Sequence, residues 1–192
     1  MKPNRNIKEV NVPGPFFYNA KRLNAIILGA DPSNFSDKGK RTILTKAFGI
    51  GDGDARYFQG ILANLKEIGL NLEDIYVDNL IQKYLNSETS KNIDWTRLAK
   101  QNITECLGRL DKIDERRRLP VFITAEAIFA VISSSNKKAV YYYTNPDSIP
   151  VSPADNELRR PIIPLYRHLK YSLQNPARNN YRFKIIELLK KG

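Results

Sequence analysis

Three polar residues that could do chemistry stand just after short apolar runs of the chain, and an aromatic residue lies between them. Asp31, Asn79 and His168 each follow such a run, and Phe48 lies in the loop after the first. A carboxylate can activate a water molecule, an amide can both donate and accept hydrogen bonds, and an imidazole N–H can donate to a developing anion. An aromatic ring can stack on a planar ligand. Taken singly, each residue also has an ordinary role in a turn, a cap, the surface or the core.

The apolar runs alternate with segments of helical periodicity. We predict buried strands at 25–28, 75–77, 121–123 and 162–166. Helices are predicted from Asp52 or Asp54 to Gly69, from Asp94 through Leu110 with a polar end at 111–118, over 128–132 and over 181–189. This alternation predicts one α/β domain over residues 1–192, a three-layer α/β/α sandwich with a central, mainly parallel four-stranded sheet. Ligands of such sheets bind beyond the carboxyl ends of the strands, where the polar residues above are expected to lie.

Charge and composition narrow the class of protein. The chain has 31 Lys and Arg against 20 Asp and Glu residues, a net charge of +11, which favours binding to phosphate backbones. It has no apolar run near the ~20 residues of a membrane-spanning helix and no apolar stretch of the signal-peptide type behind its first residues. The single cysteine, Cys106, excludes a disulfide or a cysteine-held cluster within the chain. We expect a cytoplasmic monomer with no membrane partner.

In their order and spacing, these residues resemble the uracil-DNA glycosylase superfamily. That family opens with a strand ending in Gly-x-Asp-Pro, which this chain matches at 29–32. An aromatic residue follows, here Phe48; the second strand ends in Asn79, and the last in His168. The resemblance spans about residues 25–173. It implies a DNA-repair enzyme that flips uracil, or a related damaged base, out of single- or double-stranded DNA and hydrolyses its N-glycosidic bond without a metal or organic cofactor.

The resemblance also implies a role for each residue. Asp31 would orient or deprotonate the attacking water and face the sugar cation, and His168 would donate to the uracil carbonyl oxygen as it gains charge. Asn79 would read the polar edge of uracil, and Phe48 would stack on the flipped base. Two further residues are assigned to the substrate site, Gly29 and Ser33.

Two stretches depart from the best-known branch of that family. Ser33 stands where that branch has a tyrosine that blocks the methyl group of thymine, and His168 is not followed by its proline and serine. We expect Leu169 to act as an apolar wedge in DNA, and Lys170 and Ser172 to contact phosphates. The departures motivate a rival hypothesis, a glycosylase-like fold that binds nucleic acid or a nucleotide without cutting it. A third hypothesis is an unrelated α/β enzyme that acts on a small molecule.

Four other segments yield weaker predictions. Residues 49–54 begin like a dinucleotide fingerprint, but Asp54 replaces its last glycine, so we interpret them as a loop leading into a helix cap. The run of tyrosines at 141–143 favours an extended segment. Residues 145–161 are rich in proline and polar residues and predict a surface loop near the site. The basic run at 116–118 predicts a solvated helix end.

Overall fold

The computed structural model describes residues 11–35, 41–52 and 56–191, and its centre is a four-stranded parallel sheet. The strands lie in the order β4-β1-β5-β6, and every pairing between them is parallel. Their bounds are β1 (Ala25–Gly29), β4 (Ile75–Asn79), β5 (Val121–Ile123) and β6 (Ile162–Pro164). The predicted α/β class and central sheet are confirmed.

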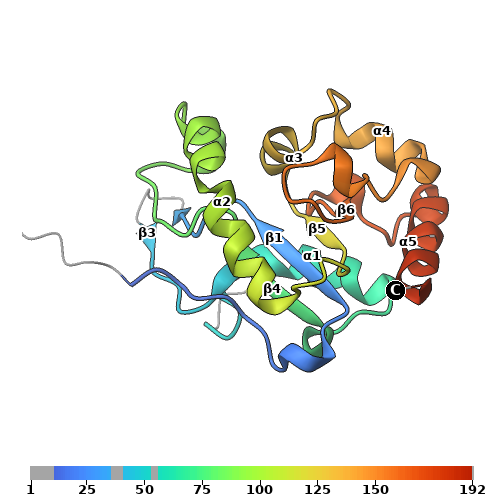
Figure 1. Cartoon of the computed structure of the whole chain (residues 1–192), viewed down its shortest axis with the longest axis horizontal. Coiled ribbons are helices and arrows are strands. Elements are labelled where there is room, and N and C mark those ends of the chain that lie inside the picture. Colours follow the sequence, from blue (N-terminus) through green and yellow to red (C-terminus); the bar gives the residue numbers. More distant parts are fainter. Residues whose placement is uncertain (1–10, 36–40, 53–55, 192) are drawn as a thin grey trace, which may run out of the picture.

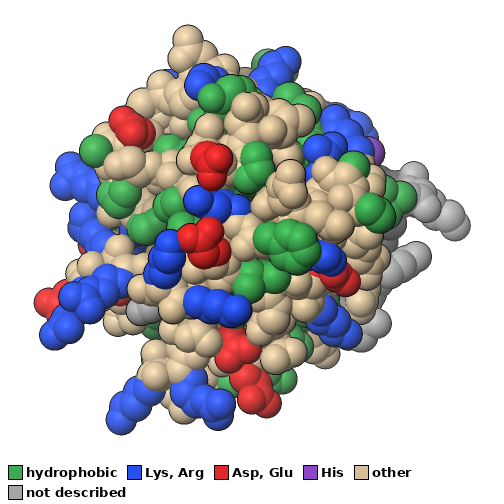
Figure 2. All heavy atoms as spheres, turned by 90° about the vertical axis from the view of Figure 1, so that its right-hand side faces the viewer, with side chains coloured by type: hydrophobic (Ala, Val, Ile, Leu, Met, Phe, Trp, Pro, Cys, Tyr) green, Lys and Arg blue, Asp and Glu red, His purple; other side chains and the backbone are tan. Residues whose placement is uncertain are grey.

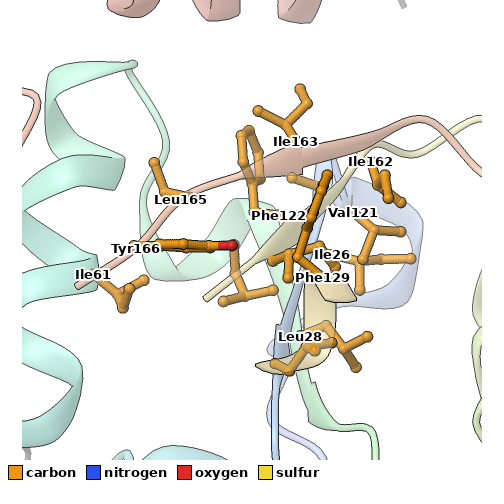
Figure 3. Packing of buried hydrophobic residues seen from close by; sticks show 14 of the residues in the cluster. Ile26, Leu28, Ile61, Val121, Phe122, Phe129, Ile162, Ile163, Leu165 and Tyr166 are labelled. Atoms are coloured by element: carbon orange, nitrogen blue, oxygen red, sulfur yellow. The ribbon is translucent and has the colours of Figure 1, made fainter. Parts of the chain in front are cut away.

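Helices cover the sheet. Every residue of the four strands is buried, and because successive side chains of a strand point to opposite faces, both faces are covered. In Figure 1, α2 (Trp95–Ile113) crosses in front of the sheet, and α1 (Arg56–Glu67) lies behind it. Figure 3 shows side chains of β1, β5 and β6 packed in one cluster with Phe129 and Ile61.

The remaining elements are short, apart from the last helix. The other helices are α3 (Glu126–Ile132), α4 (Ala139–Thr144) and α5 (Asn179–Lys191). Strands β2 (Asn34–Phe35) and β3 (Arg41–Thr42) form a separate antiparallel pair. The 3-10 turns are η1 (Ala20–Arg22), η2 (Ala47–Gly49), η3 (Leu72–Asp74), η4 (Thr89–Lys91), η5 (Pro146–Ser148), η6 (Pro153–Asp155), η7 (Leu169–Tyr171) and η8 (Pro176–Arg178). Within the described ranges, no helix combines the length and apolarity needed to cross a membrane.

The extended segment expected at 141–143 is wrong, because these residues form the middle of α4. Tyr142 and Tyr143 are buried, and the Tyr143 ring stacks on Tyr181 with ring centroids 4.2 Å apart. The Tyr143 hydroxyl also accepts a hydrogen bond from the backbone N–H of Tyr166 at 2.9 Å. Packing against α5 and the end of β6 thus outweighs the β propensity of tyrosine.

Three further expectations have mixed outcomes. Asp94 is the N-cap residue of α2, as expected. Asp52 accepts hydrogen bonds from the backbone N–H and the hydroxyl of Thr45, while Asp54 lies outside the described residues. The stretch 145–161 is more than a surface loop, because Val151 pairs with Ile162 of β6.

The basic run at 116–118 is not a helix end, because α2 ends at Ile113; an ion-pair network instead holds the chain between α2 and β5. The guanidinium of Arg160 is fully buried and contacts the carboxylates of Asp111 and Asp114. Asp111 also accepts two hydrogen bonds from Arg117, at 3.0 and 2.7 Å. This network lies at the amino ends of β5 and β6, on the edge of the sheet opposite to the strand ends considered next.

Candidate functional site

A cavity of about 590 Å³ opens at the carboxyl ends of the strands. The two sheet neighbours of β1 are β4, the next strand of the central sheet along the chain, and β5 on its other side. The loops after β1 and β5 therefore diverge, which is where open α/β sheets bind ligands. The cavity is lined from both of these loops, and also from the end of β4, η2, η4 and the segment after β6. The residues are Ala30, Asp31, Pro32, Ser33, Leu44, Phe48, Asn79, Glu88, Thr89, Ser90, Ala125, Glu126, Ala127 and Arg167.

The Asp31 carboxylate is held in the cavity wall by three donors. Its Oδ1 accepts from the backbone N–H of Ser33 at 2.9 Å. Its Oδ2 accepts from the Thr89 hydroxyl at 2.6 Å and from the Trp95 indole N–H at 3.0 Å. An ionised carboxylate has about four acceptor positions, so these described partners leave one for a water or a ligand. The group is oriented and still able to accept a proton or a hydrogen bond.

Asn79 places a buried amide in the same cavity. It is the last residue of β4, opposite Gly29 in the register, and only 4% exposed. Its backbone N–H and C=O are bonded to Asp78 and Arg109, but its side-chain amide makes no hydrogen bond to any residue that the structure describes. Neither polar atom of the amide is fully enclosed, so the amide faces the cavity, where a water or a ligand can satisfy it.

Gly29 lies beneath the Asn79 amide and the Phe48 ring. A Cβ atom there would lie 2.5 Å from both Asn79 Oδ1 and Phe48 Cζ, so only glycine allows their close approach. Phe48 has φ 59°, a left-handed conformation that costs a bulky residue about 1–3 kcal/mol. Its ring is buried against that of Phe58 of α1, with centroids 5.4 Å apart. The amide and the ring are thus packed over the same piece of backbone.

Ser33 lines the cavity, but its polar groups serve the loop. Its hydroxyl accepts a hydrogen bond from the backbone N–H of Leu85 at 2.6 Å, and its own N–H donates to Asp31. We therefore assign Ser33 to shaping the wall and orienting the carboxylate. Its small side chain leaves that part of the wall open.

The residues after β6 are placed differently from the prediction. His168 is exposed, and it is not among the described residues that line the cavity. Its Nδ1 accepts from the backbone N–H of Lys170 at 3.2 Å, which puts the proton of the neutral ring on Nε2. Leu169 is 86% exposed, Lys170 is exposed and Ser172 is half-buried. The structure places Asp31, Ser33, Phe48 and Asn79 along one cavity, but it does not bring His168, Leu169, Lys170 or Ser172 into that cavity.

Sequence reasoning missed several residues of the site. Arg167, next to the predicted His168, is the residue of this segment that lines the cavity. Glu88, which is paired with Lys91 at 2.9 Å, and Glu126 also line it. For Arg167 the available signal was position, because neighbouring side chains of an extended segment point to opposite sides. For Thr89 and Trp95 the sequence holds no signal, since each meets Asp31 across about sixty residues.

The cavity therefore combines an oriented carboxylate, an unpaired buried amide and an aromatic ring. Together they can stack a planar ligand, read its polar edge and direct a water molecule toward it. In the part of the chain that the structure describes, no three His, Cys, Asp or Glu side chains form a group that could hold a metal ion. Comparison with family models, curated proteins and solved structures found no match to this chain, so its function must be inferred from the cavity itself.

Proposed function

We propose that this chain is a DNA glycosylase that hydrolyses the N-glycosidic bond of uracil, or of a related damaged base, after flipping it into the cavity. The observation that carries this proposal is that Asp31, Phe48 and Asn79 line one cavity, with Phe48 and Asn79 packed over Gly29. The resemblance to uracil-DNA glycosylases predicted these residues from their order alone. Their meeting in one cavity at the expected edge of the sheet is what that chemistry requires.

Asp31 serves the sugar side of the bond. The bond breaks toward an oxocarbenium-like sugar and a base that leaves with the bonding electrons. The free acceptor position of Asp31 takes a hydrogen bond from the attacking water, and its negative charge faces the sugar cation. The water oxygen bonds to the anomeric carbon, and its proton passes to the carboxylate. The bonds from Thr89 and Trp95 keep the carboxylate aimed throughout.

Asn79 and Phe48 serve the base. The Asn79 amide offers two donors and an acceptor, which match a carbonyl and the neighbouring N–H of uracil. Cytosine presents a different pattern and would leave a buried group unpaired, at about 1–3 kcal/mol. Stacking of the base on Phe48 contributes about 1–3 kcal/mol and tolerates different bases. Base choice therefore depends on Asn79 and retention in the cavity on Phe48.

Two groups can balance the negative charge of the leaving base. The Arg167 side chain comes from a residue of the cavity lining, while His168 carries its Nε2–H just outside. A donor aimed at a developing charge contributes only if it is already in place, so the geometry favours Arg167 over His168. His168 would act only if the segment turned toward a bound base.

The positive net charge of the chain supports DNA as its binding partner. The net charge of +11 favours binding to a phosphate backbone. Figure 2 shows Lys and Arg side chains beside the one histidine, at the upper edge of the face in view. Leu169 is exposed next to that histidine, as a side chain that inserts between bases would have to be. We propose that the protein acts on DNA as a cytoplasmic monomer.

The second candidate is binding without cutting. The observation that favours it is the position of His168 outside the cavity, together with two further carboxylates, Glu88 and Glu126, in its lining. Those carboxylates oppose a leaving group that gains negative charge. In this case the cavity would hold a base or nucleotide and release it unchanged.

An alkali-cleavage assay separates the two candidates. Labelled single- and double-stranded oligonucleotides with one uracil are incubated with the protein, and abasic sites are then cleaved with alkali. We expect breaks at uracil that form about 10²–10⁴-fold more slowly with Asp31→Asn. Asp147→Asn, which changes an exposed carboxylate of η5, should leave them unchanged. Binding with no breaks, on uracil or on a panel of other damaged bases, would establish the second candidate instead.

A further inference from the structure

The residue before Asn79 is a buried carboxylate with every acceptor position in use. Asp78 is 1% exposed. Its Oδ1 accepts from the Asn79 backbone N–H and from the Gln82 amide, both at 2.7 Å. Its Oδ2 accepts from Arg109 Nε at 2.9 Å and from the Tyr76 hydroxyl at 3.4 Å. Since a carboxylate has about four such positions, Asp78 has none left for a ligand.

Arg109 of α2 completes the contact from the other side. While its Nε bonds Asp78, its Nη2 donates to the backbone carbonyl of Asn79 at 2.7 Å. The guanidinium is a rigid planar fork, so the two bonds fix Asp78 and the Asn79 carbonyl relative to each other. The backbone N–H and C=O of Asn79 are thus both held by one ion pair, which we call the Asn79 clamp (Asp78 and Arg109).

The position of Asn79 at the edge of the sheet explains why a clamp is needed. β4 is an outer strand of the central sheet, so the backbone groups on its outer side have no sheet strand to pair with. Val77 exchanges two backbone hydrogen bonds with Phe16 on that side, at 2.8 and 2.9 Å. Asn79, two residues further on, points its N–H and C=O in the same direction. There the clamp supplies the partners that a strand would otherwise provide.

We propose that Asp78 and Arg109 are positioning residues that hold the Asn79 amide in its base-reading orientation. The inference rests on the proposed function for its effect on activity. The clamp touches only the backbone of Asn79 and leaves its side-chain amide unpaired in the cavity. A fixed backbone with an unsatisfied side chain is the arrangement of a preorganised recognition group. Arg109 therefore acts on the base through Asn79, without contacting it.

The test replaces Arg109 with lysine, which keeps the charge and loses the fork. The matched control is Arg117→Lys, because Arg117 also binds one carboxylate through Nε and Nη2, at the opposite edge of the sheet. We measure kcat and KM on a uracil oligonucleotide, and inhibition by free uracil. Misplacing a recognition group by about 1 Å costs about a hundredfold, so we expect a tenfold to hundredfold loss of kcat/KM and weaker uracil inhibition for Arg109→Lys. Arg117→Lys should match the wild type.

A second measurement does not depend on activity. The Asn79 backbone N–H is protected from hydrogen exchange by Asp78, so NMR should show its exchange at least tenfold faster in Arg109→Lys and unchanged in Arg117→Lys. Burial raises the pKa of the Cys106 thiol to about 12, so a thiol reagent that fails to label Cys106 shows that α2 is still packed. If Arg109→Lys does not fold, Asp78→Asn combined with Arg109→Gln removes both charges together and takes its place.

The outcomes separate the two proposals. A wild-type protein that neither cleaves uracil DNA nor is affected by uracil would end the proposed function, while the exchange of the Asn79 N–H would still test the clamp. Unchanged exchange and kinetics in Arg109→Lys would overturn the clamp. Equal losses in Arg109→Lys and Arg117→Lys would also overturn it, because they would show a general effect on stability rather than positioning of Asn79.

Discussion

The two sides of the cavity differ in how their functional groups are held. On the side of β1 and β4, Asp31 accepts one hydrogen bond from its own loop and two from distant segments, η4 and α2, and the Asn79 backbone is held from α2. On the side of β6, His168 is the N-cap residue of η7. Its ring and its carbonyl accept from the backbone N–H groups of Lys170 and Tyr171, which lie only two and three residues further along the chain. The first side is organised before any ligand binds. On the second side, η7 is anchored by Tyr171, which is buried against Tyr143, whereas the exposed His168 ring is bonded only locally, to the backbone N–H of Lys170. A ligand could therefore reorient the His168 ring at little cost.

The largest effect should come from removing the charge that directs the water. Asp31→Asn keeps the shape of the side chain but removes the carboxylate that accepts the proton. We expect the single-turnover rate of uracil release to fall by about 10²–10⁴-fold, the usual contribution of a general base. Inhibition by free uracil should persist, because Asn79 and Phe48 are unchanged. A variant with near-normal turnover would show that the organised side of the cavity does not carry the chemistry.

Comparing Arg167→Ala with His168→Ala tests the contrast directly. Because Arg167 lines the cavity, its loss should lower kcat by about 10²–10³-fold, as for other donors that face a developing anion. His168 lies outside and should matter by about tenfold or less, the value of one exposed hydrogen bond. Single-turnover kinetics on the same oligonucleotide measures both. The reverse order would mean that the segment after β6 turns into the cavity when DNA binds.

Asn79→Ala tests whether the unpaired amide recognises the base. Its removal should weaken inhibition by free uracil by about 1–3 kcal/mol, because a polar edge of the ligand loses its partners. Asn136→Ala changes an exposed asparagine and serves as the control. Competition by free uracil and free cytosine against the oligonucleotide gives both affinities. If selectivity for uracil survived in Asn79→Ala, the base would have to be read by another group of the cavity.

The smallest effect concerns the support of Asp31. Thr89→Val removes the hydroxyl that donates at 2.6 Å but keeps the shape, whereas Thr89→Ser keeps the hydroxyl. A hydrogen bond to a charged group contributes about 1.5–3 kcal/mol. Because Trp95 and the Ser33 N–H still hold the carboxylate, we expect kcat to fall by about tenfold in Thr89→Val, with KM unchanged and near-normal kinetics in Thr89→Ser. Equal behaviour of the two variants would show that the hydroxyl does not orient Asp31.

The sequence predicted the organised side of the cavity better than the other. The apolar runs around β1 and β4 are continuous and buried on both faces, so their ends, and with them Asp31 and Asn79, could be placed from the pattern alone. The segment after β6 has no such pattern, and the prediction chose His168 where Arg167 lines the cavity. The helix at α4 was missed for a similar reason, because its tyrosines are organised by contacts with Tyr166 and Tyr181.

By itself, the sequence determined the α/β class, the positions of the four strands and the edge of the sheet where polar residues gather. These follow from the spacing of apolar residues along the chain, which is a local property. Only the tertiary structure decided which side chains face the cavity and what holds them. Thr89, Trp95 and Arg109 meet their partners across 30 to 64 residues, and of the adjacent residues Arg167 and His168 the first lines the cavity and the second does not. Such contacts depend on how the helices pack on the sheet, which no local pattern records.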